Sequence, residues 1–395
     1  MSRNPIAITG MGIISAIGNN VAENESSLLE SRHGIKKYSV QDPLIHQKKW
    51  VGEILKSNEE FYSELNLNPS GAFTRSTLLG LSAAKEAVRS AGLNLNDGLK
   101  TGFISATTVG GMDATEKYYF DFRESETRRK FIPTQNCGIH AEQIAGILGI
   151  KDYVTTISTA CSSAANAIML GVRMIKAGIL DRAIVGGTDS LSAFTINGFS
   201  SLMIYSDEHC QPFDDERKGL NLGEAAAYIV LESEEAANEK KALGFLAGYG
   251  NANDAFHQTA SSDNGEGSYL AMKTALEIAD LKPEEIDYVN AHGTATPNND
   301  FSEGKSILRI FENIPDFSST KAFTGHTLAA AGAVEAVFSL LALKNQTVFA
   351  NLNWKTPMKE FDLKPQTEIK SREIKTVLSN SLGFGGNCSC LIFVK

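Results

Sequence analysis

A cysteine at a strand-to-helix junction is the residue of this chain best placed to do chemistry. Cys161 follows a β-prone run, residues 153–157, and precedes an apolar segment with helical spacing, residues 164–175. Backbone N–H groups and the dipole at the start of a helix favour a thiolate over a thiol. The small neighbours leave room for a second chain to reach the sulfur. A free cysteine is more often a small buried hydrophobe than a nucleophile, so the assignment depends on the other motifs.

Two histidines and a lysine in the second half of the chain are the other candidates. His292 follows an expected strand, residues 286–290, and precedes a glycine. His326 ends the segment Thr-Lys-Ala-Phe-Thr-Gly-His, whose lysine is Lys321. Taken one at a time, such histidines are most often turn or core residues, and such a lysine is a solvated charge. Their function therefore has to be argued from the elements that bring them to the cysteine.

Apolar strands alternate with amphipathic helices along the chain, and this alternation predicts an α/β fold. The expected strands are residues 6–9, 101–108, 153–158, 182–187, 226–232, 242–250, 286–290, 377–382 and 390–394, and the expected helices are residues 74–91, 141–149, 267–279 and 329–343. A polar stretch, residues 233–241, divides the chain into an N-terminal half, residues 1–240, with the cysteine and a C-terminal half, residues 241–395, with the histidines. Each half places a reactive side chain just after a strand, as a duplicated α/β core would.

Composition and charge exclude several classes of partner. The chain has 395 residues, 42% of them hydrophobic, and a net charge of −9, which argues against general affinity for nucleic acid or anionic membrane. The start of the sequence lacks the pattern of a signal peptide, and we expect no window to approach the roughly 20 apolar residues of a membrane span. Cys388 and Cys390 lack a second pair to complete a zinc site, so we expect no metal. These features predict a cytoplasmic protein.

Five segments together resemble those of the β-ketoacyl-acyl-carrier-protein synthases, in particular the elongating Cys-His-His branch of the thiolase-like superfamily. The segments are Ile157-Ser-Thr-Ala-Cys-Ser-Ser, Arg217-Lys-Gly-Leu-Asn-Leu-Gly-Glu, Asn290-Ala-His-Gly-Thr, Thr320-Lys-Ala-Phe-Thr-Gly-His and Gly383-Phe-Gly-Gly. The resemblance runs from residue 6 to the C-terminus. It implies a homodimer with a thiolase-like fold, a duplicated α/β core in α-β-α-β-α layers.

The resemblance implies a role for each reactive group. Cys161 would take an acyl group from a carrier thioester. His292 and His326 would hold the enolate oxygen that forms when a malonyl thioester loses CO2, because two neutral imidazoles donating Nε2–H can do this without a metal. The backbone N–H groups of Cys161 and Phe384 would form the oxyanion hole, and the Phe384 ring would gate the thiol.

The resemblance also assigns a supporting network. Lys321 would be a buried lysine paired with Asp300 and Glu303, and this network would hold the histidines in place rather than make bonds. Glu335 would be a structural or ion-binding carboxylate carried on a helix.

Three further positions match groups that contact substrate in the family. Thr294 and Thr296 match hydroxyls that bind the pantetheine arm, and Val109 matches a position that lines the end of the acyl pocket. No cofactor is implied, because the substrates are carried on the phosphopantetheine of acyl carrier protein.

A basic cluster is the candidate docking surface for that carrier. An acidic enzyme needs a local basic entrance for an acidic partner, and Arg128, Arg129 and Lys130 form a cluster that resembles the family's docking stretch. Family members often have more basic residues near 70–76, where this chain has only Arg75.

The sequence thus predicts a decarboxylating Claisen condensation that gives a 3-oxoacyl carrier protein, CO2 and free carrier in fatty acid elongation. The glycine turn continues with Asn387-Cys388 where the family usually has Thr-Asn. That departure leaves open a dedicated type II polyketide or polyene pathway. A non-catalytic chain-length partner typically lacks the cysteine, a biosynthetic thiolase uses a different two-cysteine chemistry, and the initiating branch replaces the second histidine with asparagine.

Overall fold

The structure, a computed structural model, describes residues 5–39, 49–68, 70–237 and 240–395, so residues 238–239 of the expected boundary stretch lie outside it. The strands of its large sheet are β1 (Ile6–Ser15), β4 (Thr101–Ala106), β5 (Tyr153–Ile157), β6 (Arg182–Asp189), β8 (Ala225–Glu232), β9 (Gly244–Asn253), β10 (Tyr288–Asn290), β11 (Asp316–Ser318), β14 (Thr376–Leu382) and β15 (Asn387–Val394). Short strands are β2 (Ile35–Lys37), β3 (Trp50–Gly52), β7 (Leu222–Gly223), β12 (Thr347–Val348) and β13 (Lys370–Ser371).

The large sheet contains the same topology twice. Its order is β11-β10-β14-β15-β9-β1-β8-β6-β4-β5. In the N-terminal half, β1, β8 and β6 pair antiparallel, and β6, β4 and β5 pair parallel. In the C-terminal half, β9, β15 and β14 pair antiparallel, and β14, β10 and β11 pair parallel. The halves join where β1 runs antiparallel to β9, so the duplicated core predicted from the sequence is confirmed.

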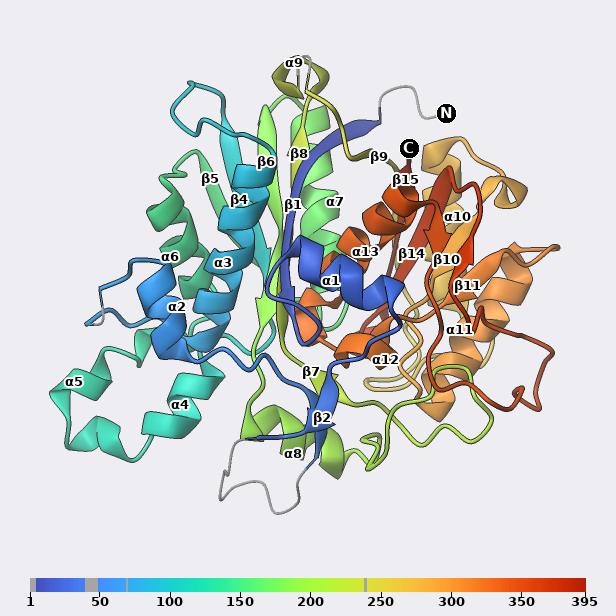
Figure 1. Ribbon diagram of the computed structural model, residues 1–395, viewed down its shortest axis with the longest axis horizontal. Helices are drawn as coiled ribbons and strands as arrows, with labels where there is room; N and C mark the ends of the chain where they lie inside the picture. The colour runs from blue at the N-terminus through green and yellow to red at the C-terminus, as the bar shows by residue number, and fades with distance from the viewer. Residues whose placement is uncertain (1–4, 40–48, 69, 238–239) are drawn as a thin grey trace.

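Helices cover and separate the two halves of the sheet (Figure 1). They are α1 (Val21–Leu29), α2 (Asn58–Glu64), α3 (Arg75–Ser90), α4 (Met112–Tyr118), α5 (Glu126–Arg129), α6 (Ile139–Leu148), α7 (Ser163–Lys176), α8 (Ala193–Ser201), α9 (Glu234–Ala237), α10 (Glu266–Ala279), α11 (Pro297–Ile310), α12 (Lys321–Thr324) and α13 (Ala331–Asn345). α3 packs on β1 and β8, α10 packs on β9 and β15, and α7 and α13 pack between the halves on β6, β8 and β14. The result is the α-β-α-β-α layering expected of a thiolase-like fold.

One helical stretch is apolar enough to span a membrane by length and composition, so the expectation that no window would approach a span is wrong. It covers Leu328–Asn345, with a mean hydropathy of 1.4 and 89% of its residues buried inside the protein. In α13, every residue from Ala331 to Leu343 is buried. A helix that is buried on all sides is the expected core helix of a large protein, and here it lies between the two halves of the large sheet.

The layering brings three strand ends together. Cys161 follows β5, the outermost strand of its half, and His326 follows β11, the outermost strand of the other half. The two residues precede the central helices α7 and α13, which contact each other. His292 follows β10, beside β11. Each side chain therefore lies at the carboxyl end of a parallel strand, the edge at which α/β sheets place ligand sites.

Candidate active site

The nucleophile candidate lies on a strained turn. Ala160 has φ +52°, a left-handed conformation that costs an alanine about 1–3 kcal/mol. Two hydrogen bonds hold the turn: the Thr159 N–H donates to Ser163 Oγ at 2.8 Å, and Ser163 Oγ donates to the Ala160 carbonyl at 2.5 Å. The turn places Cys161 at a cavity of about 300 Å³.

The thiol of Cys161 is harder to ionise than the sequence indicated. Burial raises its pKa to about 11, although the charge of Lys321 and a hydrogen bond from the Phe384 N–H both act to lower it. The expectation of a thiolate is therefore wrong for the resting site, because the loss of hydration outweighs the nearby donors. The Phe384 bond places that N–H beside the sulfur, where an oxyanion donor is needed.

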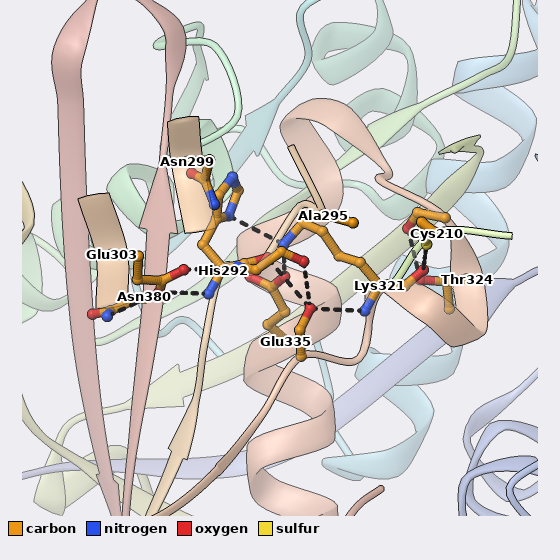
Figure 2. Close-up of polar contacts among 12 residues, drawn as sticks. Cys210, His292, Ala295, Asn299, Glu303, Lys321, Thr324, Glu335 and Asn380 are labelled. Atoms are coloured by element: carbon orange, nitrogen blue, oxygen red, sulfur yellow. Dashed lines mark hydrogen bonds and ion pairs between the residues drawn. The ribbon is translucent and has the colours of Figure 1, made fainter. Parts of the chain in front are cut away.

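Lys321 lies between a histidine and a glutamate (Figure 2). Its Nζ donates to His292 Nδ1 at 3.1 Å and forms an ion pair with Glu335, on α13. The predicted pairing of Lys321 with Asp300 and Glu303 is wrong. The lysine begins α12 and faces α13, while both of those carboxylates lie on α11.

The two carboxylates of α11 instead bind the backbone around the first histidine. Glu303 accepts the N–H groups of His292 and Gly293, each at 2.8 Å (Figure 2). Asp300 accepts those of Phe213 and Ala295 at 2.7 and 3.1 Å. They position the histidine through its main chain. The helix that carries them begins with Pro297, a favoured first residue, but it was not among the helices expected from the sequence.

Both histidines are held neutral. Burial lowers their pKa values well below the usual 6.5, and the charge of Lys321 lowers both further. Because an ammonium group only donates, His292 Nδ1 must accept, which leaves the proton on Nε2. The rings of His292 and His326 have centroids 5.3 Å apart and an interplanar angle of 88°, and both line the cavity with Cys161. The site thus combines a thiol with two neutral imidazoles.

Burial also raises the pKa values of Glu335 and Glu303 to about 7. Lys321 acts to lower the pKa of Glu335, and the backbone N–H groups of Gly293 and His292 act to lower that of Glu303. The pKa of Asp300 is also raised by burial. The three carboxylates are therefore costly to ionise, and their hydrogen bonds offset part of that cost.

The cavity mouth combines predicted and unexpected residues. Thr294 and Thr296 line it, with their hydroxyls 2.9 Å apart. The ring of Phe384 stacks on Phe199 at a centroid distance of 5.7 Å, and the Gly385 N–H donates to the Gln258 carbonyl at 2.8 Å. Residues of the mouth that were not singled out from the sequence are Phe199, Met203, Ile204, Leu220, His257, Thr259, Ala260, Ser261, Asn298 and Asn299. Apart from His257 they are not reactive residue types, and His257 stands in no recognisable motif, so no signal in one sequence marks them.

Val109, which was predicted to line the acyl pocket, lies away from the cavity lining. Val109 is buried in an apolar cluster with Ile196 and Leu328, a cluster that also contains the cavity residue Leu220. Its role at the end of an acyl pocket stays a prediction.

Asp189, which was not predicted, is the last residue of β6 and accepts hydrogen bonds from Thr107, Thr108, Val109 and Ala329. It ties the loop after β4 to the start of the central helix.

The basic cluster lies at the surface, and its docking role stays a prediction. Arg128 and Arg129 are exposed on α5, Arg128 lies 4.3 Å over the Tyr118 ring, and Lys130 donates to the Ser70 carbonyl. Arg75 does not extend this surface. Its side chain is only 17% exposed and forms an ion pair with Glu224 at 2.6 Å.

Comparison with known proteins identifies the family. The model for the "Beta-ketoacyl synthase, N-terminal domain" matches residues 3–237, and that for the C-terminal domain matches residues 243–355. The chain belongs to the β-ketoacyl synthases and is an acyl-transferring synthase of the thiolase superfamily, similar to the elongating Cys-His-His enzymes.

Individual relatives agree with this assignment over the full length. The 3-oxoacyl-[acyl-carrier-protein] synthase 2 of Staphylococcus aureus (strain N315) is 34% identical, over 100% of this chain and 99% of the relative. The ishigamide ketosynthase/chain length factor structure has a TM-score of 0.92 and 27% identity, over 100% of this chain and 99% of that one. A type II polyketide ketosynthase solved with its acyl-carrier protein has a TM-score of 0.88 and 26% identity, over 99% of both chains.

Proposed function

We propose that this enzyme condenses an acyl thioester held on Cys161 with malonyl-acyl-carrier protein, giving 3-oxoacyl carrier protein, CO2 and free carrier. The observation that carries the proposal is one cavity lined by a thiol and by two neutral histidines, one of them with its proton assigned to Nε2 by Lys321.

Acyl transfer comes first. The Cys161 sulfur attacks the carbonyl carbon of the acyl thioester, and the oxyanion accepts the N–H groups of Cys161 and Phe384. The carrier sulfur then leaves and takes the proton that the thiol gives up. Because the pKa of the free thiol is about 11, this proton must leave as the carbon–sulfur bond forms.

Condensation follows at the other side of the cavity. The malonyl thioester loses CO2, and the enolate oxygen accepts hydrogen bonds from His292 and His326. The enolate carbon attacks the acyl carbonyl, and the Cys161 sulfur leaves and takes up one proton from water, which restores the thiol. Lys321 holds the first histidine as a donor, and the hydroxyls of Thr294 and Thr296 bind the pantetheine arm of each substrate in turn.

We propose fatty acid elongation as the pathway, supported by the full-length relative named 3-oxoacyl-[acyl-carrier-protein] synthase 2. Type II polyketide or polyene synthesis is the second candidate, and the ishigamide ketosynthase/chain length factor likeness favours it. Of the two, only the second is expected to extend acyl groups that already carry conjugated double bonds or oxo groups.

We also propose a cytoplasmic homodimer that binds acyl carrier protein through Arg128, Arg129 and Lys130. β5 ends the large sheet, and all five of its residues are half-exposed and uncharged. An uncharged sheet edge is a favourable place for a second copy to pair.

Intact-mass measurement of Cys161 acylation tests the proposal. Wild type, Cys161→Ala and Cys137→Ala are mixed with saturated and polyunsaturated acyl carrier thioesters, and malonyl carrier protein is then added. We expect acylation of wild type and Cys137→Ala but not of Cys161→Ala, followed by release of 3-oxoacyl carrier. Acylation of no variant by any thioester would instead support a non-catalytic subunit.

A further inference from the structure

The side chain of Asn387 joins two segments that meet at the thiol. Its Oδ1 accepts three hydrogen bonds, from Ser162 Oγ at 2.7 Å, from Asn166 Nδ2 at 2.8 Å and from Asn251 Nδ2 at 3.0 Å. Ser162 is the residue after the nucleophile, and Asn166 lies in the first turns of α7. Asn387 begins β15, directly after the glycine turn 383–386.

A second set of hydrogen bonds closes this connection into a network. Asn166 Nδ2 also donates to Thr159 Oγ1 at 2.8 Å, and its Oδ1 accepts from Ser389 Oγ at 3.2 Å. Asn251, on β9, donates to Ser389 Oγ at 3.0 Å. The network therefore links the nucleophile turn, the start of β15 and β9, and a fully connected polar network holds its members in one arrangement.

The two donors of the oxyanion hole lie on the two sides of this connection. One is the N–H of Cys161, next to Ser162, and the other is the N–H of Phe384, three residues before Asn387. The segments also touch through Gly383, where a Cβ would lie 2.9 Å from the Thr159 carbonyl oxygen and 3.2 Å from the Cys161 nitrogen. The Gly383 N–H donates to the Asn387 carbonyl at 2.8 Å. Any shift of Asn387 is therefore passed to the turn that carries Phe384.

We infer that Asn387 is a positioning residue that sets the spacing between the two oxyanion donors and so controls the rate of acyl transfer to Cys161. The inference rests on the acyl transfer proposed above. It concerns the steps with a tetrahedral oxyanion, and not the histidine side of the cavity, which is built from β10, α12 and α13. It also gives a function to the asparagine found where similar enzymes usually have threonine.

Two reactions of the same thiol separate positioning from general damage. Acylation by an acyl carrier thioester passes through an oxyanion, whereas alkylation by iodoacetamide displaces iodide at a saturated carbon and forms none. We compare the two rates at Cys161 in wild type, Asn387→Ala, Asn387→Thr and Cys390→Ala. Cys390 is a buried residue of the same strand outside the network, and thermal melting checks that each variant folds.

We expect Asn387→Ala to slow acylation by about 10–100-fold, less than or equal to the loss of a whole oxyanion donor. Alkylation, compared at equal thiolate fraction because the Phe384 N–H also bonds the thiol, should stay within about twofold of wild type. Asn387→Thr keeps an acceptor oxygen and recovers much of the rate, and Cys390→Ala keeps both rates. Unchanged acylation in Asn387→Ala, or a parallel fall of both reactions, would overturn the inference. If wild type itself is alkylated but never acylated, the proposed function fails first.

Discussion

The floor and the rim of the cavity are built on different principles. The floor consists of residues that are each no more than 6% exposed, namely Cys161, His292, His326, Lys321 and Glu335. Lys321 contacts His292 and Glu335 within this chain. The rim is the cavity mouth described above. There, Met203 is 88% exposed and Phe256, next to the lining residue His257, is 59% exposed. The floor is therefore buried within one chain, whereas the rim exposes large apolar side chains.

This difference separates two kinds of mutational effect. A change on the floor leaves a buried charge or donor without its partner, which costs several kcal/mol and alters the chemistry. A change at the rim removes little from the fold and alters only how a carrier is held. The predictions below test this division, beginning with the largest expected effect.

The reactivity of the Cys161 thiol should depend steeply on pH. Because burial raises its pKa to about 11, the thiolate fraction should rise about tenfold per pH unit below that value, and alkylation by iodoacetamide about 100-fold between pH 7 and pH 9. The pH dependence of the alkylation rate, measured by intact mass, checks this. A plateau already at pH 8 would show that the floor stabilises a thiolate after all.

Replacing Lys321 with alanine should damage both fold and chemistry. The substitution leaves Glu335 unpaired and frees His292 Nδ1, so we expect a loss of about 3–5 kcal/mol in unfolding free energy and a fall in kcat of about 100-fold. It should also move the alkylation profile of Cys161 to higher pH, because the lysine lowers that pKa.

Lys344→Ala is the matched control for Lys321. This lysine lies on α13 and forms an exposed ion pair with Glu25, so its loss should cost no more than about 1 kcal/mol. Denaturant unfolding and the pH profile of alkylation are the measurements. An unmoved profile in Lys321→Ala would show that the lysine acts on the fold alone.

At the rim, Met203→Glu should weaken carrier binding without harming the site. A negative charge at the mouth repels an acidic carrier, so we expect KM for an acyl carrier thioester to rise about tenfold, with kcat and KM for a small acyl thioester unchanged. Met203→Leu keeps the apolar surface and should behave as wild type. A fall in kcat with both substrates would place this residue with the floor.

The smallest effect is expected at the basic cluster. Arg128→Ala and Arg129→Ala should each raise KM for the carrier thioester about threefold at low salt, and the effect should shrink as salt rises. Lys375→Ala, whose exposed side chain forms an ion pair with Glu373, is the control and should change nothing. Salt-independent effects at the arginines would argue against electrostatic docking.

The sequence predicted the floor well because its residue types and their order are tied to the reaction. Cys161, His292 and His326 were found in segments that resemble one family, and the structure brings them to one cavity. Which carboxylate pairs with Lys321 could not be foreseen, because it depends on how α12 faces α13. The raised pKa of the thiol depends on burial by distant segments, and the local pattern gave the opposite direction.

The rim was harder to predict because its residues come from loops, α8 and the start of α11, and its one histidine, His257, stands in no motif that marks it. Arg75 also shows that a local pattern does not reveal contacts between residues far apart in the sequence. It is the basic residue of the stretch that was compared with the family's docking surface, and it instead forms an ion pair with Glu224, 149 positions along the chain.

The central helix has a consequence for how the protein is made. α13 packs on β8, which is synthesised before it, and on β14, which is synthesised after it. Until the last part of the chain has left the ribosome, an 18-residue apolar stretch is covered by only one of the two halves of the large sheet. Such surfaces are where growing chains aggregate or recruit chaperones. The duplicated architecture therefore does not give two halves that fold in turn, since each half completes its core only when the other is present.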